Sequence, residues 1–174
     1  IYSPADFGAF AVYLSIVGIL ATVSSLRYEQ VIVLPANEHK AYSLLWLAFI
    51  VAFIVCFFIA IYFVFFSSAF CRFIDFPQKY QHWLFYVPLS VFLLSVYQAL
   101  NYYLIRLKLF RQSASNKVER RIAEGLVQVT AGKLGFTGGL VWGDIAGQTI
   151  NAVAAGIKIK KSLINYKFNF KLIK

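Results

Sequence analysis

Charged side chains are scarce in this sequence. Asp, Glu, Lys and Arg make up only 14% of the 174 residues, whereas soluble domains have about a quarter. Three runs contain no charge at all, at residues 7–26, 44–66 and 84–105. Each run reaches the roughly 20 residues that a helix needs to cross a hydrocarbon core of about 30 Å. The composition excludes an ordinary soluble domain and predicts an integral membrane protein.

Cysteine is also rare, and methionine is absent. Cys56 and Cys71 would lie about 22 Å apart on one helix, beyond the Cα separation of about 7 Å that a disulfide allows. We therefore expect two free thiols without a redox or metal role. The sequence has no G-x-x-x-x-G-K-[ST] motif and no Ser/His/Asp or metal-ligand spacing, so we expect no catalytic residue, metal or cofactor. Neither a methionine nor a basic segment precedes the first apolar run, so we expect a further helix upstream.

Positive charge, by contrast, is plentiful, and it is clustered. The net charge is +10, and the clusters comprise Arg106, Lys108, Arg111, Lys117, Arg120 and Arg121, followed by Lys158, Lys160, Lys161, Lys167, Lys171 and Lys174. Basic clusters that flank membrane segments mark the cytoplasmic side, where anionic headgroups attract them. We therefore expect residues 106–121 and 158–174 to be cytoplasmic, and we expect no nucleic-acid partner.

The number of spans follows from this sidedness. If both basic clusters lie on one side, the chain between them crosses the membrane an even number of times. The glycine-rich segment 132–139 suits a turn between two short spans, at about 121–135 and 138–157. An interfacial amphipathic segment is the alternative, although Lys133 is its single basic residue. We predict an all-α, polytopic helix bundle with five spans over residues 1–157, followed by a basic cytoplasmic tail over 158–174.

Polar side chains follow one face of each of the last three predicted spans. At 100° per residue, the faces comprise Ser90, Tyr97, Gln98 and Asn101, then Glu124 and Gln128, then Asp144, Gln148 and Asn151. A charge near the bilayer centre costs at least about 2.5 kcal/mol, so we expect these faces to converge on the bundle interior or a water-filled cavity. The alternative is that Glu124 and Asp144 lie near helix ends and satisfy local groups, with Arg121 close to Glu124.

Small residues form a second stripe on the last span. Gly139, Gly143 and Gly147 recur every four residues, a spacing that lets two helix backbones approach closely in lipid. We interpret them as helix-packing residues.

A charge pair interrupts the first apolar region. Arg27 and Glu29 precede the apolar residues 31–34 and Pro35, so the first helix could continue to Leu34 and stop at the proline. In that case the pair would lie near the cytoplasmic boundary, as the mouth of a cavity or simply as the marker of the end of a span.

Four segments in this order and spacing resemble a known family. They are Y2-S-P-A-D-F-G8, R27-Y-E-Q-V-I-V-L-P35, L107-K-L-F-R-Q-S-A114 and G138-G-L-V-W-G-D-I-A-G-Q148. Together they resemble the polysaccharide biosynthesis protein family, the Wzx-like O-antigen flippases of the multidrug/oligosaccharidyl-lipid/polysaccharide exporter superfamily. The resemblance implies a bacterial inner-membrane transporter, not an enzyme. It also implies two six-helix lobes around a central cavity, of which this chain corresponds to helices two to six of the first lobe.

The resemblance implies a substrate and a candidate site. Such a flippase translocates polyprenyl-pyrophosphate-linked oligosaccharide for O-antigen or capsular polysaccharide, in the bilayer and alongside other polysaccharide-assembly proteins. The candidate cavity residues are Arg27, Glu29, Gln98, Asn101, Arg106, Glu124, Asp144, Gln148 and Asn151, with the two arginines Arg27 and Arg106 attracting the pyrophosphate. The alternatives are a membrane-embedded transferase or polymerase of the same pathway, or a related exporter of other amphiphiles.

Overall fold

The chain folds into a bundle of long helices. The computed structural model describes residues 2–25, 28–35 and 37–172, with the backbone alone described at residue 39 and from 161 onward. All regular elements in these ranges are helical: α1 (Pro4–Ser24), α2 (Tyr28–Val31), α3 (Glu38–Phe73), the 3-10 helix η1 (Gln78–Tyr86), α4 (Val87–Arg106), α5 (Phe110–Lys133) and α6 (Gly139–Leu172). The prediction of an all-α helix bundle is confirmed.

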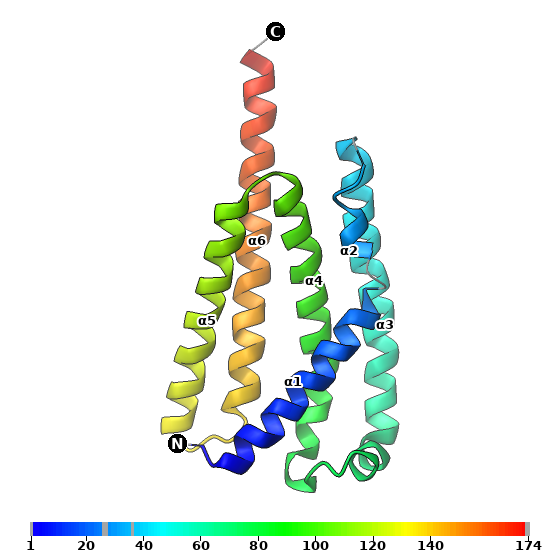
Figure 1. The fold of residues 1–174 in the computed structure, drawn as a ribbon, viewed down its shortest axis with the longest axis vertical. Helices are drawn as coiled ribbons and strands as arrows, with labels where there is room; N and C mark the ends of the chain where they lie inside the picture. Colours follow the sequence, from blue (N-terminus) through cyan, green and yellow to red (C-terminus); the bar gives the residue numbers. More distant parts are fainter. Residues whose placement is uncertain (1, 26–27, 36, 173–174) are drawn as a thin grey trace.

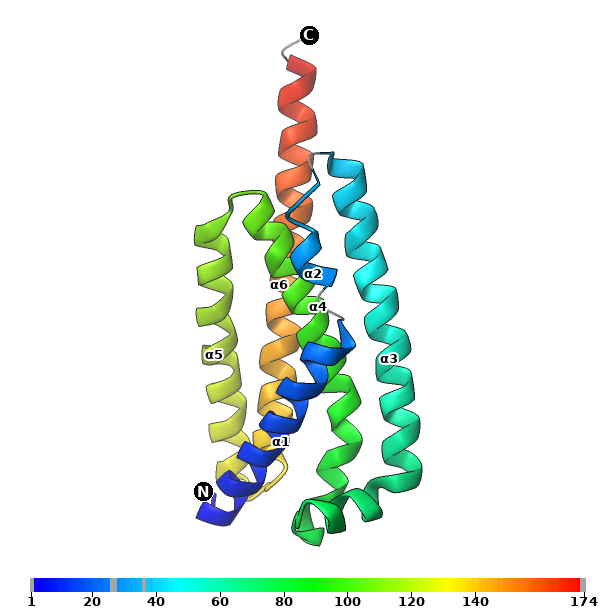
Figure 2. The same ribbon diagram turned by 45° about the vertical axis from the view of Figure 1, so that its right-hand side comes forward.

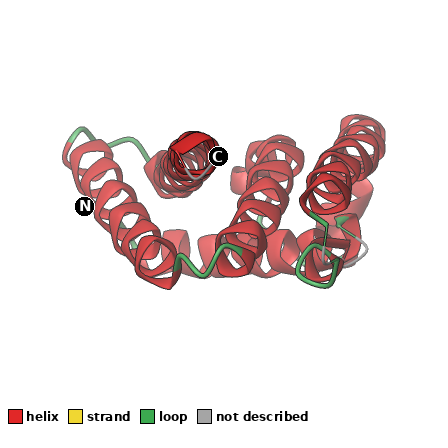
Figure 3. Ribbon diagram, turned by 90° about the horizontal axis from the view of Figure 1, so that it is seen from above, coloured by secondary structure: helices red, strands yellow, loops and turns green. Residues whose placement is uncertain are grey.

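The long helices alternate in direction along the bundle axis (Figures 1 and 2). Helix α4 lies at the centre and packs against α1, α3 and α6, while α5 packs mainly on α6. Helix α1 crosses the front of the bundle obliquely, and the short α2 leads from its upper end towards the start of α3 (Figure 1). Seen along the axis, the helices spread into an elongated cross-section (Figure 3). Because α4 contacts α6 directly, these two helices can bring their predicted polar faces together.

Three helical segments in the described part of the chain are long and apolar enough to cross a membrane, namely Pro4–Ser24, Lys40–Phe73 and Gln78–Arg106. At 1.5 Å per residue, the 36 residues of α3 extend about 54 Å, more than a hydrocarbon core requires. Many large apolar side chains of α3 are exposed, among them Phe53, Phe58 and Phe65, as expected of a surface that faces lipid. Helices α5 and α6 carry more polar residues, of which Asn116, Asp144, Gln148 and Asn151 are buried.

Helix α1 is shorter than the longest helix that the sequence pattern allows. Ser3 caps its start: the Ser3 hydroxyl accepts from the Asp6 backbone N–H at 3.2 Å, while the Asp6 carboxylate accepts from the Ser3 N–H at 2.8 Å. At the other end, the hydroxyls of Ser24 and Ser25 both donate to the Ala21 carbonyl oxygen. The sequence allowed one helix through Leu34, but α1 ends at Ser24, near the end of the span predicted at 7–26.

The two basic segments are largely helical, contrary to the expected loop and tail. The connection between α4 and α5 is confined to residues 107–109, where Lys108 adopts a left-handed φ of 57° that closes the turn. Helix α5 then begins at Phe110, with Arg111, Lys117 and Arg121 on its exposed side. Helix α6 continues through Leu172 into the predicted tail. Hydropathy marks where apolar residues stop, whereas a helix can continue through polar residues of good propensity.

Polar contacts hold α1 onto the rest of the bundle. The hydroxyls of Tyr13 and Ser90 lie 2.6 Å apart, and those of Ser24 and Ser95 lie 2.7 Å apart, both pairs buried between α1 and α4. At the lower end, the Tyr80 hydroxyl donates to the Asp6 carboxylate at 2.6 Å. Lipid tails are as apolar as the side chains of α1, so apolar burial alone does not fix the position of this helix in a membrane. The hydrogen bonds to α4 and η1 therefore define its position.

Candidate functional site

An ion pair lies buried between α5 and α6. The Arg120 guanidinium donates to one carboxylate oxygen of Asp144 at 3.0 Å, and the Gln148 side-chain amide donates to the other at 2.6 Å. The Asp144 residue has no exposed surface, and the Arg120 side chain is 19% exposed. A buried carboxylate needs such partners, because an unpaired charge in a low-dielectric interior is strongly unfavourable. The acidic face of α6 thus turns inward.

Unsatisfied polar atoms surround this pair. Within the described residues, no hydrogen-bond partner exists for Arg120 Nε, Gln148 Oε1, either amide atom of Asn151, or the Tyr97 hydroxyl. The Tyr97 hydroxyl lies near the Asn151 amide, but the geometry falls short of a hydrogen bond. Buried polar atoms without partners are rare in native proteins and mark places where water or a polar ligand binds. We call Tyr97, Arg120, Asp144, Gln148 and Asn151 the buried polar cluster.

Glu124 pairs with a neighbour on its own helix, as the alternative prediction had it. Its carboxylate accepts from the Arg121 guanidinium at 2.9 Å, one turn back on α5, although the residue itself is buried against α6. The structure therefore pairs Glu124 with a neighbour on its own helix and leaves it outside the buried polar cluster.

The glycine stripe of α6 lies against α5. A Cβ at Gly147 would lie 3.1 Å from the Arg120 carbonyl oxygen, and one at Gly143 would overlap the Gln128 side chain. A Cβ at Gly139 would overlap Ala131. The close approach at these positions is what brings Arg120 within reach of Asp144.

A polar cleft adjoins the buried polar cluster, between α1, α2, α4 and α5. It has a volume of about 370 Å³ and is lined by Thr22, Glu29, Gln30, Tyr97, Gln98, Asn101, Tyr102, Ile105 and Lys117. Three predicted cavity residues, Glu29, Gln98 and Asn101, therefore share one cleft. Tyr97 lines the cleft, but its hydroxyl is buried in the cluster, so this residue lies between the two.

The two arginines expected at the mouth have different outcomes. Arg106 donates to the backbone carbonyl oxygens of Ile32 and Val33 at 3.4 Å each and also to that of Pro35. It therefore fastens the segment after α2 to the end of α4, and it does not line the polar cleft. Arg27 lies outside the described residues.

Two residues that link α5 to α6, Arg120 and Lys158, were not predicted from the sequence, where they were only members of the basic clusters. Arg120 continues the face of Glu124 and Gln128 by one helical turn, and this i, i+4 spacing was a signal that could have found it. Lys158 donates to Glu119 at 2.9 Å, to Ser115 and to Asn116, which ties α6 to the first turns of α5. No periodic signal predicts Lys158, because its partners lie on another helix.

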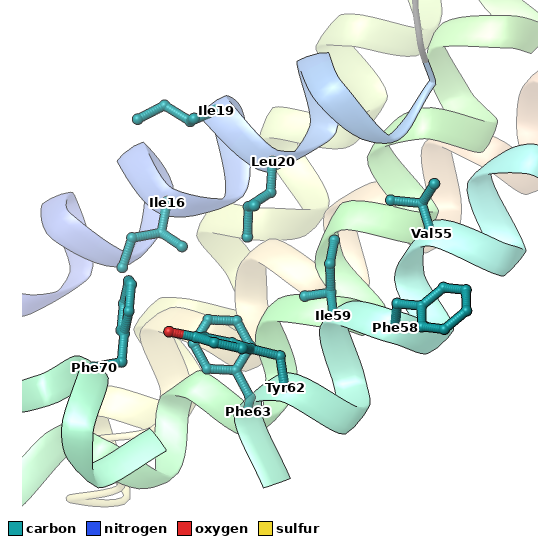
Figure 4. Close-up of a pocket in the computed structure, with 9 residues that line it drawn as sticks. All are labelled: Ile16, Ile19, Leu20, Val55, Phe58, Ile59, Tyr62, Phe63 and Phe70. Atoms are coloured by element: carbon teal, nitrogen blue, oxygen red, sulfur yellow. The ribbon is translucent and has the colours of Figure 1, made fainter. Parts of the chain in front are cut away.

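An apolar groove lies between α1 and α3. It has a volume of about 510 Å³ and an almost wholly apolar lining that includes Ile16, Leu20, Ile59 and Phe63 (Figure 4). Helices α1 and α3 touch little, so the groove is a gap between two lipid-exposed helices. The lining of the groove is therefore as apolar as the lipid tails of a bilayer.

Metal ligands do not gather in the described residues: no group of three or more His, Cys, Asp or Glu side chains is placed to hold an ion. Cys56 and Cys71 are buried free thiols.

Comparisons with known proteins identify the family. The polysaccharide biosynthesis protein family matches residues 1–174, the entire sequence. In the same comparisons, no curated protein and no solved structure matches the chain. The family match confirms the resemblance carried by the four sequence segments. With its membrane-spanning helices and its inward polar faces, the chain belongs to the polysaccharide biosynthesis protein family.

Proposed function

We propose that this protein is a flippase that translocates polyprenyl-pyrophosphate-linked oligosaccharide across the bacterial inner membrane for O-antigen or capsular polysaccharide. The observation that supports this most is the polar cleft in a helical membrane bundle, with the buried polar cluster packed beside it at Tyr97. Membership of the polysaccharide biosynthesis family supports the choice of a glycan as cargo.

The cleft suits transport of a headgroup that lipid alone excludes. A glycan needs hydrogen-bond partners in the bilayer, and Gln98 and Asn101 of α4 offer amides in the cleft lining. The polyprenyl tail needs no polar lining and stays in the hydrocarbon beside the bundle. In this mechanism, the protein binds the polar part of the substrate and leaves the apolar part to the membrane.

The distribution of charge supports the orientation. The α4–α5 connection and the far part of α6 lie at one end of the bundle, and the α5–α6 turn and η1 lie at the other (Figure 1). In the sequence, all but three of the 17 Lys and Arg residues fall in the stretches 27–40, 106–121 and 158–174, the exceptions being Arg72, Lys79 and Lys133. By the positive-inside rule, the first end is cytoplasmic, where the pyrophosphate of the substrate is loaded.

Deletion of the gene in the organism that makes this protein tests the proposal. A flippase deletion should remove surface polysaccharide and cause complete lipid-linked units to accumulate on the cytoplasmic face. A transferase deletion would instead leave incomplete units, and a polymerase deletion would leave single units at the cell surface. Mass spectrometry of the extracted lipid intermediates, combined with surface labelling, distinguishes these results, and either of the last two patterns refutes the flippase.

A further inference from the structure

Glu29 is a buried carboxylate in the wall of the polar cleft. Only 6% of the residue is exposed, and its Oε2 atom has no hydrogen-bond partner in the described part of the chain. None of the ion pairs found among these residues includes it. An ionised carboxylate accepts hydrogen bonds only, so this oxygen calls for a donor, which water or a ligand hydroxyl can supply.

The remaining lining is typical of a site for sugars. Gln98 and Asn101 of α4 supply amides, and Tyr97 and Tyr102 of the same helix supply aromatic rings. The Asn101 side-chain oxygen already accepts from Ser113, which holds that amide in one orientation. A volume of about 370 Å³ lies at the small end of ligand pockets, which span roughly 300–1,000 Å³, and so suits a sugar ring better than a long glycan.

The charge of the Glu29 carboxylate favours a sugar over a pyrophosphate at this wall of the cleft. A negative Glu29 carboxylate repels a phosphate oxygen placed beside it, and the low dielectric of a buried site strengthens that repulsion. Lys117, the one cation among the described residues of the cleft lining, comes from α5 and is exposed. The inner wall therefore favours neutral hydroxyl donors, and the outer rim tolerates an anion.

We propose that the polar cleft is a subsite for one sugar ring of the lipid-linked glycan, with the Glu29 carboxylate accepting a sugar hydroxyl and Gln98 and Asn101 completing the hydrogen bonds. This inference rests on the proposed function. It assigns recognition of the glycan to the segment after α1 and places the pyrophosphate away from Glu29.

Binding measurements on the purified protein in nanodiscs test the subsite. The probes are bare polyprenyl pyrophosphate and the same lipid bearing one N-acetylglucosamine, galactose or glucose residue. The wild type should bind at least one sugar-bearing probe about tenfold or more tighter than the bare lipid, the change expected from losing one hydrogen bond to a charged group. Glu29→Gln and Gln98→Ala should each bring that ratio towards one, and Glu29→Gln should leave binding of the bare lipid unchanged or tighter.

Glu38→Gln is the matched control, because Glu38 is an exposed carboxylate at the start of α3 outside the cleft. It should keep the wild-type ratio, and thermal unfolding of each variant checks that the fold is intact. A sugar preference that survives both Glu29→Gln and Gln98→Ala overturns the subsite, as does an equal loss for the bare lipid. If the wild type binds bare and sugar-bearing lipids equally, the subsite is wrong and the flippase proposal stands. If no probe binds, both fail.

Discussion

The Arg120–Asp144 pair offers the sharpest test of the buried polar cluster. Arg120→Leu removes every donor that the guanidinium presents, and it leaves the Asp144 carboxylate with the Gln148 amide as its one described partner. Asp144→Asn removes the negative charge instead and leaves the guanidinium unpaired. The two single variants break the same contact from opposite sides, but the groups that they leave behind differ in exposure.

The magnitudes follow from that exposure. Breaking a buried ion pair by removing one partner costs about 3–5 kcal/mol. Arg120→Leu should lie in this range, because the Asp144 side chain that it leaves is 1% exposed. Asp144→Asn should cost less, about 2 kcal/mol, since the Arg120 side chain is 19% exposed and water can reach it. The double variant leaves no unpaired charge, so it should be about 1–3 kcal/mol more stable than Arg120→Leu alone.

Unfolding of the purified protein in mixed micelles at neutral pH measures these free energies. Increasing amounts of a denaturing detergent are added, and helix content is followed by circular dichroism. The decisive comparison is between Arg120→Leu and the double variant, because a second substitution is expected to restore stability. If the double variant is less stable than Arg120→Leu, the carboxylate does not depend on the guanidinium, and the proposed pairing is refuted.

Two further perturbations test the contact between α5 and α6. Gly143→Ala should cost about 1–3 kcal/mol, because its Cβ would overlap an α5 side chain and lie 3.1 Å from an α5 carbonyl oxygen. The control Gly156→Ala meets nothing within 4 Å and should stabilise the same helix by up to about 1 kcal/mol, so equal effects in the detergent titration would contradict close packing. In the first half of α5, hydrogen bonds from Ser115 and Lys158 lower the pKa of Glu119 below its ordinary 4.5. Since the folded pKa is depressed, the ionised carboxylate stabilises the protein above pH 4.5, and this contribution disappears as the pH falls through the folded pKa. Thermal unfolding should therefore separate wild type from Glu119→Gln at pH 7, by at most about 1 kcal/mol for so exposed a pair, and a gap that persists at pH 2 would contradict the assignment.

Much of the helical framework could be predicted because hydropathy is a local property. Residues 44–66 contain no charge over a length that crosses a bilayer, and α3 covers them. Helix ends were harder to predict. Helix α1 ends at Ser24, whereas the apolar residues that follow allowed continuation to Leu34.

The inward face of α6 was also predictable, since Asp144, Gln148 and Asn151 recur at helical spacing. The identity of their partner was not. Arg120 lies 24 residues away on α5 and meets Asp144 only because the two helices approach at the glycine stripe. For the same reason, Arg106 looked like a residue for phosphate in the sequence, yet it bonds to the carbonyl oxygens that follow α2.

The sequence by itself determined that this is a helical membrane protein with polar faces, and its segments indicated the family. These properties depend on composition and on spacing along one helix. Only the tertiary structure decided which polar groups meet, that Glu29 is buried with one carboxylate oxygen unpaired among the described residues, and that Glu29, Gln98 and Asn101 line one cleft. Such relations depend on the rotation and separation of helices distant in the chain, and no local pattern encodes them.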